Sequence, residues 1–596
     1  MIDFIKQVFA SAIGFIMVFV LFFFFLFILF VATSSDPEPK VSPNTVLFMK
    51  ASGAIPERMS SDPFEQLFFG GSPGDFSVRS FEQNLRKAAA DDNIKGILLE
   101  VDFVTASWPT LQQLRRAMLN FREDSGKFIY ATTNDLGLNE QGFYLASAAD
   151  SIFAPPMSIM QFDGFVLEGM FLKSMLDEIG VKAEVIHQGA YKSAGDMFQR
   201  TNFSAADREQ LTAIFSHITD ELEQAVAERT GMSRAEVTAM MNQPPRLDVE
   251  YYAERGLIDA IVFPSELENR IKARLGLGES DDLNRIASRR YDRVSDRSAG
   301  LERAPREAVA VIYANGAIMP GTDDPFPFGG EQGINVDNFK RSLDRALSDN
   351  NVKAIVVRIN SPGGSAATSD AIWQLIQEAR EQKPVVASMG AVAASGGYYI
   401  AMAAETIVAD RTTITGSIGV IGIRFDASRL LEDRIKLDFD ELRFHENANW
   451  FSPTRPLTGA QRDAFSFFID DAYDKFLARV SESRGMSVEE IHEVAQGRVW
   501  SGEDARNIGL IDAVGGLDLA VQFAADKAGL EAWSIREFPR EQSFIETLAS
   551  RAEVSVRSVF SRNIPMYEEM SFIRHMAETS ARPHAWAILP WQLEVK

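Results

Sequence analysis

The chain contains no cysteine among its 596 residues. This absence excludes disulfides, thiolate nucleophiles, cysteine-ligated zinc, iron–sulfur clusters and a lipidated cysteine as a membrane anchor. Histidine is scarce too: 6 are present, and none lies in a metal-ligand spacing such as H-E-x-x-H. A phosphate-binding loop of the form G-x-x-x-x-G-K-S/T is also missing. We therefore expect neither a metal ion nor a nucleotide or other cofactor.

Basic residues are in deficit, with 60 Lys and Arg against 83 Asp and Glu and a net charge of −23. This balance argues against a nucleic-acid backbone as the partner, because such binding needs clustered Lys and Arg. The contents of 46% hydrophobic and 24% charged residues are ordinary for a globular protein. The length predicts two or more domains, each with its own core.

The N-terminus has no charged residue between positions 7 and 35, and the run from Val8 to Val31 is almost entirely apolar. This run is longer than the roughly 20 residues that span a bilayer. The apolar part of a cleavable signal peptide has about 7–15 residues. We therefore predict an uncleaved single-pass anchor in residues 1–35, with cleavage near Ala32 as the alternative. Lys6 precedes the span and favours a cytoplasmic N-terminus, which puts the body outside the cytoplasm.

The rest of the chain is internally repeated. Asp91–Asp102 resembles Asp349–Asn360 at an offset of 258, and Gly256–Ala260 recurs as Gly509–Ala513 at an offset of 253. The offset drifts in one direction, as small insertions and deletions in a tandem duplication would leave it. The period is far too long for a solenoid, so we predict two copies of one domain. Between them, residues 278–307 are poor in apolar side chains and are expected to be a linker.

Each copy alternates short β-branched runs with helical patterns. Ala354–Ile359 has the composition of a buried strand, Asp370–Arg380 has helical periodicity, and Pro384–Ser388 is the next strand. Strand–helix–strand units of this kind predict an α/β fold with parallel strands and right-handed crossovers.

Two glycine-rich turns stand out in the second copy. Asn360–Ser365 follows a strand, and Ala393–Tyr398 places Ser395 among small residues just before a helix. A serine there can expose its hydroxyl while backbone N–H groups at the helix start face a developing oxyanion. Tight turns without chemistry are the alternative. The first copy has Glu140 in place of Ser395 and keeps no such glycines, which favours a nucleophile in the second copy.

A serine nucleophile needs a base, and no histidine lies near a recognisable triad turn. Lys192 is a lone cation among small and aromatic residues in Gly189–Gly195. A buried lysine can serve as the base because desolvation lowers its pKa and keeps the amine neutral. An ordinary surface lysine is the alternative. The aligned stretch of the second copy, His445–Ala448, has no lysine, so the two halves look complementary.

The combined motifs are similar to those of the signal peptide peptidase A family in its long, two-domain form, also called protease IV. Ser388–Gly390 followed by Ala393–Tyr398 resembles the nucleophile segment of that family. Tyr191–Ala194 resembles its general-base segment, and Thr415–Gly419 resembles a third segment, whose serine sits beside the lysine. The similarity covers essentially the whole chain, although the stretch after about residue 541 matches less clearly.

The resemblance implies an α/β fold with tandem ClpP/crotonase-like domains behind an N-terminal transmembrane helix. The expected boundaries are an anchor at 1–35, a first domain with the general-base lysine at 45–277, a linker at 278–307, a second domain with the nucleophile at 308–540, and an extension at 541–596.

The resemblance also implies the site residues. Ser395 is the expected nucleophile, Lys192 the proton acceptor and donor, and Ser417 the residue that orients the lysine. A turn or strand-end hydroxyl is the alternative for Ser417. The expected oxyanion hole uses the backbone of Gly363, Gly364 and Gly396.

The implied function is that of a membrane-anchored serine endopeptidase that degrades cleaved signal peptides and other extended apolar peptides with a Ser–Lys dyad. The expected assembly is a homotetramer in the bacterial inner (cytoplasmic) membrane, with its body on the periplasmic side and the bilayer contacted through the N-terminal helix. A crotonase-type acyl-CoA hydratase gives no reason for a serine in one half and a lysine in the other. A catalytically silent membrane-tethered scaffold of the same fold is the remaining alternative.

Overall fold

The computed structural model describes residues 38–58, 75–134, 137–321, 333–540 and 586–588, together with Gly14, Val18 and Phe22. The predicted membrane anchor and most of the predicted C-terminal extension lie outside this set. In the part of the chain that is described, no helix is both long and apolar enough to cross a membrane.

The first copy is built on a parallel sheet of six strands. Its continuous apolar strands are buried on both faces: in β1, Val46, Leu47 and Met49 are fully buried. Helices α3 (Val78–Ala90), α4 (Trp108–Ser125) and α5 (Glu140–Ala146) belong to the same copy. The strand order is β6 (Ala260–Ile261), β4 (Ser151–Ala154), β3 (Phe128–Thr132), β2 (Ile94–Val104), β1 (Thr45–Gly53) and β7 (Arg285–Ala287).

The second copy repeats this plan. Strands β8 (Ala308–Asn315), β9 (Val352–Ser361), β11 (Val385–Ala394), β12 (Thr406–Ala409), β16 (Ala513–Val514) and β17 (Ser534–Phe538) take the places of β1, β2, β3, β4, β6 and β7. All of these neighbours pair in parallel, and β13 (Ile414–Gly416) adds the antiparallel β15 (Val499–Ser501). Its helices include α13 (Val336–Ser348), α14 (Ala366–Arg380), α15 (Gly396–Ala401), α18 (Gly502–Asn507) and α19 (Leu517–Lys527). The predicted α/β fold with two copies of one domain is confirmed.

The segment expected to be a linker contains secondary structure that packs on the first copy. Within residues 278–307, β7 pairs with β1 as β17 pairs with β8, and α12 (Ser288–Tyr291) follows β7. The amide of Asn84 donates to Ser288 Oγ at 3.2 Å, and Lys87 Nζ donates to the Tyr291 carbonyl at 3.0 Å. The secondary structure of the first copy therefore continues to Tyr291.

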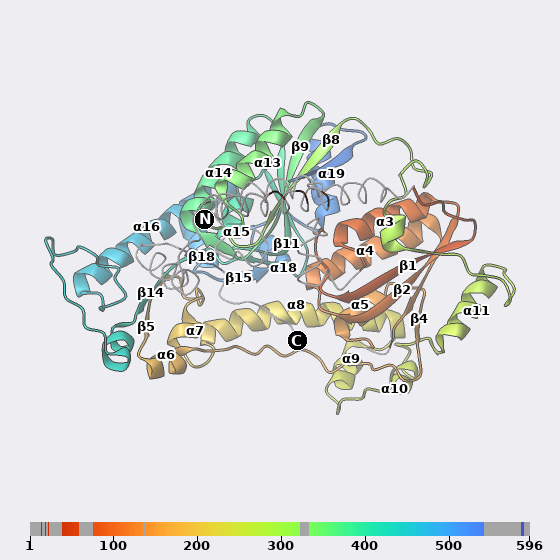
Figure 1. Ribbon diagram of the computed structural model, residues 1–596, viewed down its shortest axis with the longest axis horizontal. Helices are drawn as coiled ribbons and strands as arrows, with labels where there is room; N and C mark the ends of the chain where they lie inside the picture. The colour runs from red at the N-terminus through yellow and green to blue at the C-terminus, as the bar shows by residue number, and fades with distance from the viewer. Residues whose placement is uncertain are drawn as a thin grey trace, which may run out of the picture.

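Two long helices occupy equivalent places, α8 (Ala205–Thr230) in the first copy and α16 (Gly459–Arg484) in the second. Each begins at a hydroxyl cap: Ser204 accepts from the N–H of Asp207, and Thr458 forms a capping box with Gln461. Figure 1 shows α8 running beneath both copies, from α7 (Asp196–Gln199) to α9 (Arg234–Met241). The shorter helices are α6 (Lys173–Ile179), α10 (Val249–Ala253), α11 (Pro264–Arg274), α17 (Val488–Val494) and the π-helix η1 (Leu430–Ile435).

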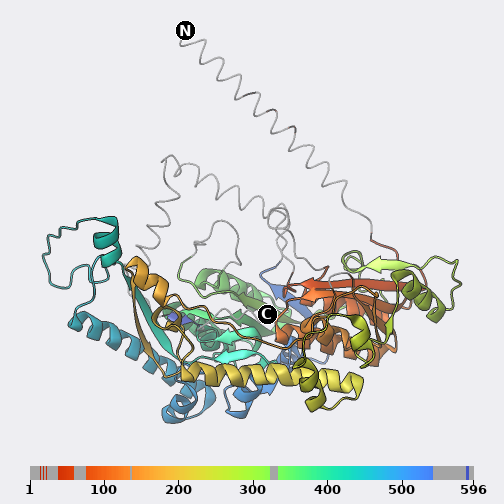
Figure 2. The same cartoon turned by 90° about the horizontal axis from the view of Figure 1, so that it is seen from below.

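A third sheet, which is antiparallel throughout, joins the copies. Its order is β10 (Gly363–Ser365), β18 (Trp586–Ile588), β14 (Val420–Asp426) and β5 (Lys182–Gln188). Strand β5 of the first copy pairs antiparallel with all seven residues of β14 of the second copy. Figure 2 shows these two strands side by side at one end of the molecule. The loop that follows β5 therefore lies against the second copy.

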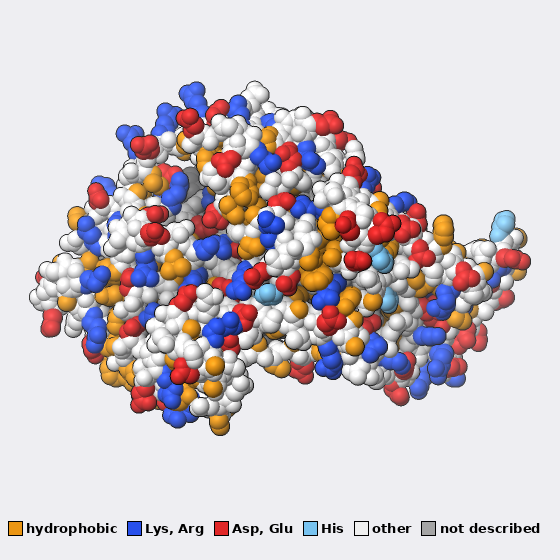
Figure 3. All heavy atoms as spheres, turned by 180° about the vertical axis from the view of Figure 1, so that it is seen from behind, with side chains coloured by type: hydrophobic (Ala, Val, Ile, Leu, Met, Phe, Trp, Pro, Cys, Tyr) orange, Lys and Arg blue, Asp and Glu red, His pale blue; other side chains and the backbone are white. Residues whose placement is uncertain are grey.

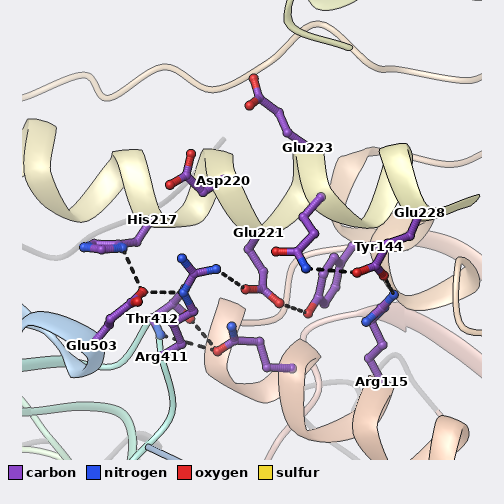
Figure 4. A network of polar contacts seen from close by, with 12 residues as sticks. Arg115, Tyr144, His217, Asp220, Glu221, Glu223, Glu228, Arg411, Thr412 and Glu503 are labelled. Carbon is purple, nitrogen blue, oxygen red and sulfur yellow. Dashed lines mark hydrogen bonds and ion pairs between the residues drawn. The ribbon is translucent and has the colours of Figure 1, made fainter. Parts of the chain in front are cut away.

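Ion pairs cross the boundary between the copies. Arg358 of β9 donates to Glu57 at 2.6 Å, and the two side chains are 1% and 9% exposed. On α8, Glu221 accepts from Tyr144 of the first copy at 2.6 Å and from Arg411 of the second copy at 3.2 Å (Figure 4). Removing one member of a buried pair leaves an uncompensated charge, so these pairs fix how the two copies meet.

The outer surface mixes both signs of charge. On the face opposite to that of Figure 1, acidic and basic side chains are interspersed, and apolar side chains gather in the middle of the face (Figure 3). This face therefore presents no broad basic surface, although the chain as a whole carries a net charge of −23.

We predict that Glu184→Ala weakens the contact between the copies. Glu184 of β5 accepts from Arg424 of β14 at 2.5 Å, and their side chains are 1% and 0% exposed. Loss of the carboxylate leaves Arg424 buried without its counter-charge, which destabilises the fold by about 3–5 kcal/mol. Urea unfolding followed by tryptophan fluorescence should show a lower midpoint. The control Asp344→Ala breaks an exposed pair with Lys340 and should leave the midpoint almost unchanged; equal shifts in both variants would contradict the prediction.

Candidate active site

Ser395 lies at the junction of β11 and α15. Its side chain is fully buried, and its backbone has φ 56° and ψ −114°, outside the regions that a non-glycine residue normally adopts. The surroundings hold it there: its N–H donates to the Gly416 carbonyl and its carbonyl accepts from Tyr399 N–H, both at 2.8 Å. Backbone strain of this kind costs about 1–3 kcal/mol and is found mostly at functional sites.

The glycines beside Ser395 are required by close packing. A Cβ on Gly396 would lie 2.7 Å from Ser369 Oγ and 3.1 Å from Gly364 N. A Cβ on Gly397 would lie 2.6 Å from the Ser361 carbonyl oxygen. The alternative that these glycines serve a tight turn therefore holds as well: the same close packing both requires glycine and positions Ser395.

Lys192 reaches Ser395 from the other copy. It lies in the loop after β5, its side chain is 1% exposed, and its Nζ is 2.7 Å from Ser395 Oγ. The same Nζ is 3.0 Å from both the carbonyl oxygen and the Oγ of Ser417. Burial lowers the pKa of Lys192 well below its usual range. The surface-lysine alternative is therefore excluded by the structure.

The three contacts match the valence of a neutral amine. An uncharged amine has two N–H donors and one lone pair. The Ser417 carbonyl and Ser417 Oγ accept the two N–H groups, and the Ser395 hydroxyl can donate to the lone pair. Ser417 is itself fixed with φ 51°, and its N–H donates to the Arg498 carbonyl at 2.7 Å. The arrangement can therefore hold an unprotonated lysine against a serine hydroxyl.

The expected oxyanion glycines gather beside Ser395. Gly363 and Gly364 have φ 101° and 156°, and the turn that they form contacts Gly396. The N–H of Gly363 donates to Ser361 Oγ at 3.2 Å. Ile318 bonds to the residues on either side of Gly364, so the N–H and carbonyl of Gly364 point away from Ile318. Among the three glycines, Gly364 and Gly396 are the better candidates for donors to an oxyanion.

Residues 496–498 were not singled out from the sequence. The N–H of Tyr191 donates to the Gln496 carbonyl at 2.9 Å, and Gly497, with φ 77°, lies against Lys192. A Cβ on Gly497 would lie 2.4 Å from Lys192 Cβ. The only trace of this role in the sequence is a Gln-Gly pair in a loop, which is too common a pattern to indicate a site.

The equivalent place in the first copy holds Glu140 instead of a serine. Its carboxylate accepts from the N–H groups of Asp163 and Gly164 at 2.8 and 2.9 Å. Burial raises the pKa of Glu140 above its usual range. The first copy therefore has an internally satisfied carboxyl group at the position of the candidate nucleophile.

Comparison with known families agrees with this division into copies. The family model described as "Peptidase family S49" matches residues 122–277 and 377–531, once in each copy and over just more than half of the chain. The chain belongs to peptidase family S49.

The relatives of this S49 chain are similar over most of their length. A chloroplastic serine protease SPPA of Arabidopsis thaliana is 35% identical over 495 residues, covering 83% of this chain and 71% of the relative. A Protease 4 of Salmonella typhi is 31% identical over 534 residues, covering 87% and 84%. A Protease 4 of Haemophilus influenzae is 32% identical over 454 residues, covering 74% and 71%. These matches identify a serine protease of the long, two-domain signal peptide peptidase A form.

Solved structures are matched over a smaller part of the S49 chain. A ClpP1 mutant from Listeria monocytogenes covers 35% of this chain and 94% of its own, with 15% identity and a TM-score of 0.23. A mutant of a membrane-bound stomatin-specific protease covers 40% and 99%, with 18% identity and a TM-score of 0.26.

We predict that Gly497→Ala lowers kcat/KM by about 100-fold or more, because displacement of a reacting group by about 1 Å has that effect. The new Cβ would overlap Lys192 Cβ and push the amine away from Ser395. The assay is hydrolysis of a fluorogenic apolar peptide. The control Gly231→Ala has nearly the same strain, with φ 76° against 77°, but has nothing within 4 Å of the new Cβ. If both variants lose the same activity, strain alone explains the loss and the positioning role fails.

Proposed function

We propose that this S49 peptidase is a serine endopeptidase with a Ser–Lys dyad, in which Ser395 is the nucleophile and Lys192 the general base. The observation that carries the proposal is the 2.7 Å contact between Lys192 Nζ and Ser395 Oγ in a fully buried setting. The amine is within the distance needed for direct proton transfer. Its lowered pKa supports the neutral form that a base must have.

The proposed reaction follows from these contacts. Ser395 Oγ attacks the peptide carbonyl while its proton passes to Lys192 Nζ. The resulting ammonium donates that proton to the leaving amine, which releases the C-terminal product and leaves an acyl-enzyme. A water molecule, deprotonated by the same amine, then hydrolyses the ester. Ser417 keeps the amine aimed at Ser395 throughout, because both of its oxygens accept from Nζ.

The oxyanion of each tetrahedral intermediate needs donors at about 2.7–3.1 Å. We propose the N–H groups of Gly364 and Gly396 as these donors, with Gly363 shaping the turn. The contact between Gly396 and the Gly363–Gly364 turn supports this choice. Backbone donors of this kind are held rigidly and need no reorganisation when the charge develops.

The proposed substrates are extended apolar peptides, including signal peptides that have already been cleaved. The strands β10 and β14 that flank the site support binding of a peptide in extended form. The proposed placement is single-pass in the bacterial inner membrane, with the catalytic body on the periplasmic side, and the apolar run from Val8 to Val31 supports an anchor. A homotetramer remains part of the proposal, as do the expected domain boundaries, except that the first domain is extended from residue 277 to Tyr291.

We expect Ser395→Ala and Lys192→Met each to lower kcat for a fluorogenic apolar peptide by at least about 10³-fold, because nucleophile and base act as a unit. Methionine keeps the volume of the lysine stem, so the fold should survive. Ser388→Ala is the matched control, because Ser388 is likewise fully buried but lies within β11, where its hydroxyl accepts from Arg358. Substantial turnover by folded Lys192→Met would rule out the lysine as the base.

The pH dependence of kcat/KM should show the lysine directly. The active form is the neutral amine, so activity is lost as the pH falls through the pKa of Lys192. Burial lowers this pKa, so the midpoint of the acid limb should lie well below the usual lysine value of about 10.4. The measurement is kcat/KM against pH, with tryptophan fluorescence as the check that the fold persists. A midpoint at or above the usual lysine value contradicts a buried neutral base.

A further inference from the structure

The third sheet contains a strand from the end of the chain. Strand β18, Trp586–Ile588, lies between β10 and β14 and pairs antiparallel with both. Its partners on β10 are Gly363, Gly364 and Ser365. Two of these three residues are the glycines that lie beside Ser395. The C-terminal strand therefore enters the candidate active site through its backbone.

The register places the end of β18 at the nucleophile. Ile588 is paired with Gly363 on one side. On the other side Trp586 is paired with Ile421, and continuing this antiparallel register puts Ile588 opposite Gly419. The carbonyl oxygen of Gly419 is 3.5 Å from Ser395 Oγ. Read from N to C, β18 thus runs toward Ser395, which is the direction of the acyl side of a peptide about to be cleaved.

The slot that β18 occupies is one strand wide. Neighbouring strands lie about 4.8 Å apart, so β10 and β14 stand about 9.6 Å from each other with β18 between them. Gly364 directs its N–H and carbonyl away from Ile318, toward the side on which β18 pairs. These groups face Ala587 in the pairing, so β18 occupies the proposed oxyanion donor of Gly364 as well as the place of a substrate strand. A second extended peptide cannot enter while β18 is in place.

We propose that the C-terminal segment Trp586–Ile588 is an intramolecular competitor of the peptide substrate, bound as an added strand on the acyl side of the groove between β10 and β14. The inference rests on the proposed function for the identity of the groove. Recognition is by main-chain pairing, which accepts many sequences. A tethered segment has an effective concentration on the order of millimolar, so even weak pairing suffices to occupy the groove.

A binding measurement tests the proposal without requiring catalysis. The probe is a fluorescein-labelled peptide with the sequence of residues 583–596, and fluorescence anisotropy gives its Kd for the Ser395→Ala protein. Two forms are compared, the full chain and one with a stop codon in place of Trp586. We expect the shortened form to bind the probe about tenfold or more tightly, because the internal competitor is gone. Equal Kd values for the two forms would overturn the proposal.

Proline variants separate the strand from the rest of the tail. Ala587→Pro in the full chain removes one backbone N–H from the middle of β18 and should reproduce the effect of the stop codon. Ala581→Pro, outside β18, is the matched control and should leave the Kd at the full-chain value. If both prolines change the Kd equally, the effect does not come from the strand and the proposal is wrong.

Kinetics then distinguish this proposal from the proposed function. With Ser395 intact, removal of β18 should lower KM for a fluorogenic peptide about fivefold or more and leave kcat within about twofold, as loss of a competitor requires. If neither form has peptidase activity but the Kd contrast persists, the proposed function fails and the competitor stands. If both forms are active with the same KM and the same Kd, the competitor alone fails.

Discussion

The position of the Lys192 amine is the constraint on which the rest of the structure depends. A charged ammonium buried without a carboxylate is disfavoured, so burial lowers the pKa of Lys192 and favours the neutral amine in the resting site. That amine still has two N–H groups that need acceptors, and Ser417 supplies both through its carbonyl and its Oγ. The remaining lone pair faces the Ser395 hydroxyl. Because the lysine and the two serines come from different copies, everything that holds the copies together also determines whether this contact exists.

The docking of the copies is correspondingly rigid. Antiparallel pairing along all of β5 and β14 fixes the translation of one copy against the other, since a slip by one residue would turn every side chain to the opposite face. The buried pair between Glu184 and Arg424 lies within this ladder and selects one register. Beyond the ladder, Gly497 permits the Lys192 backbone to approach more closely than any residue with a side chain would. Buried ion pairs such as these contribute little net stability, but they disfavour alternative arrangements in which a charge is left alone.

Part of this could be predicted from the sequence. The α/β fold and its duplication follow from periodicity and from repeated segments, because strands buried on both faces must be apolar. Ser395 and Lys192 were indicated by the small residues next to them in the sequence. They were also indicated by the aligned positions of the other copy, which have no serine and no lysine, respectively. The strand β7 was not predicted, because pairing at the edge of a sheet uses backbone groups, and Arg285–Ala287 is a short segment with only one buried side chain, that of Ile286. The role of Gly497 and the place of β18 depend on contacts between residues far apart in the sequence, such as Gly497 with Lys192 and β18 with β10 and β14, which no local pattern encodes.

The two copies also show where backbone strain is retained. In the first copy, Glu140 at the position of Ser395 is the first residue of α5 and does not have a positive φ, and the Asn139 side chain caps the helix by accepting from Gly142 N–H. The carboxylate of Glu140 satisfies two further backbone N–H groups, so that turn is relaxed and fully bonded. In the second copy, α15 starts at Ser395 with φ 56° and has no side-chain cap. The two copies share one fold, but only the second has a strained backbone at this position. The shared fold therefore does not explain the strain. In the proposed mechanism, this strain presents a hydroxyl to Lys192 and leaves the helix N–H groups available to a reacting carbonyl.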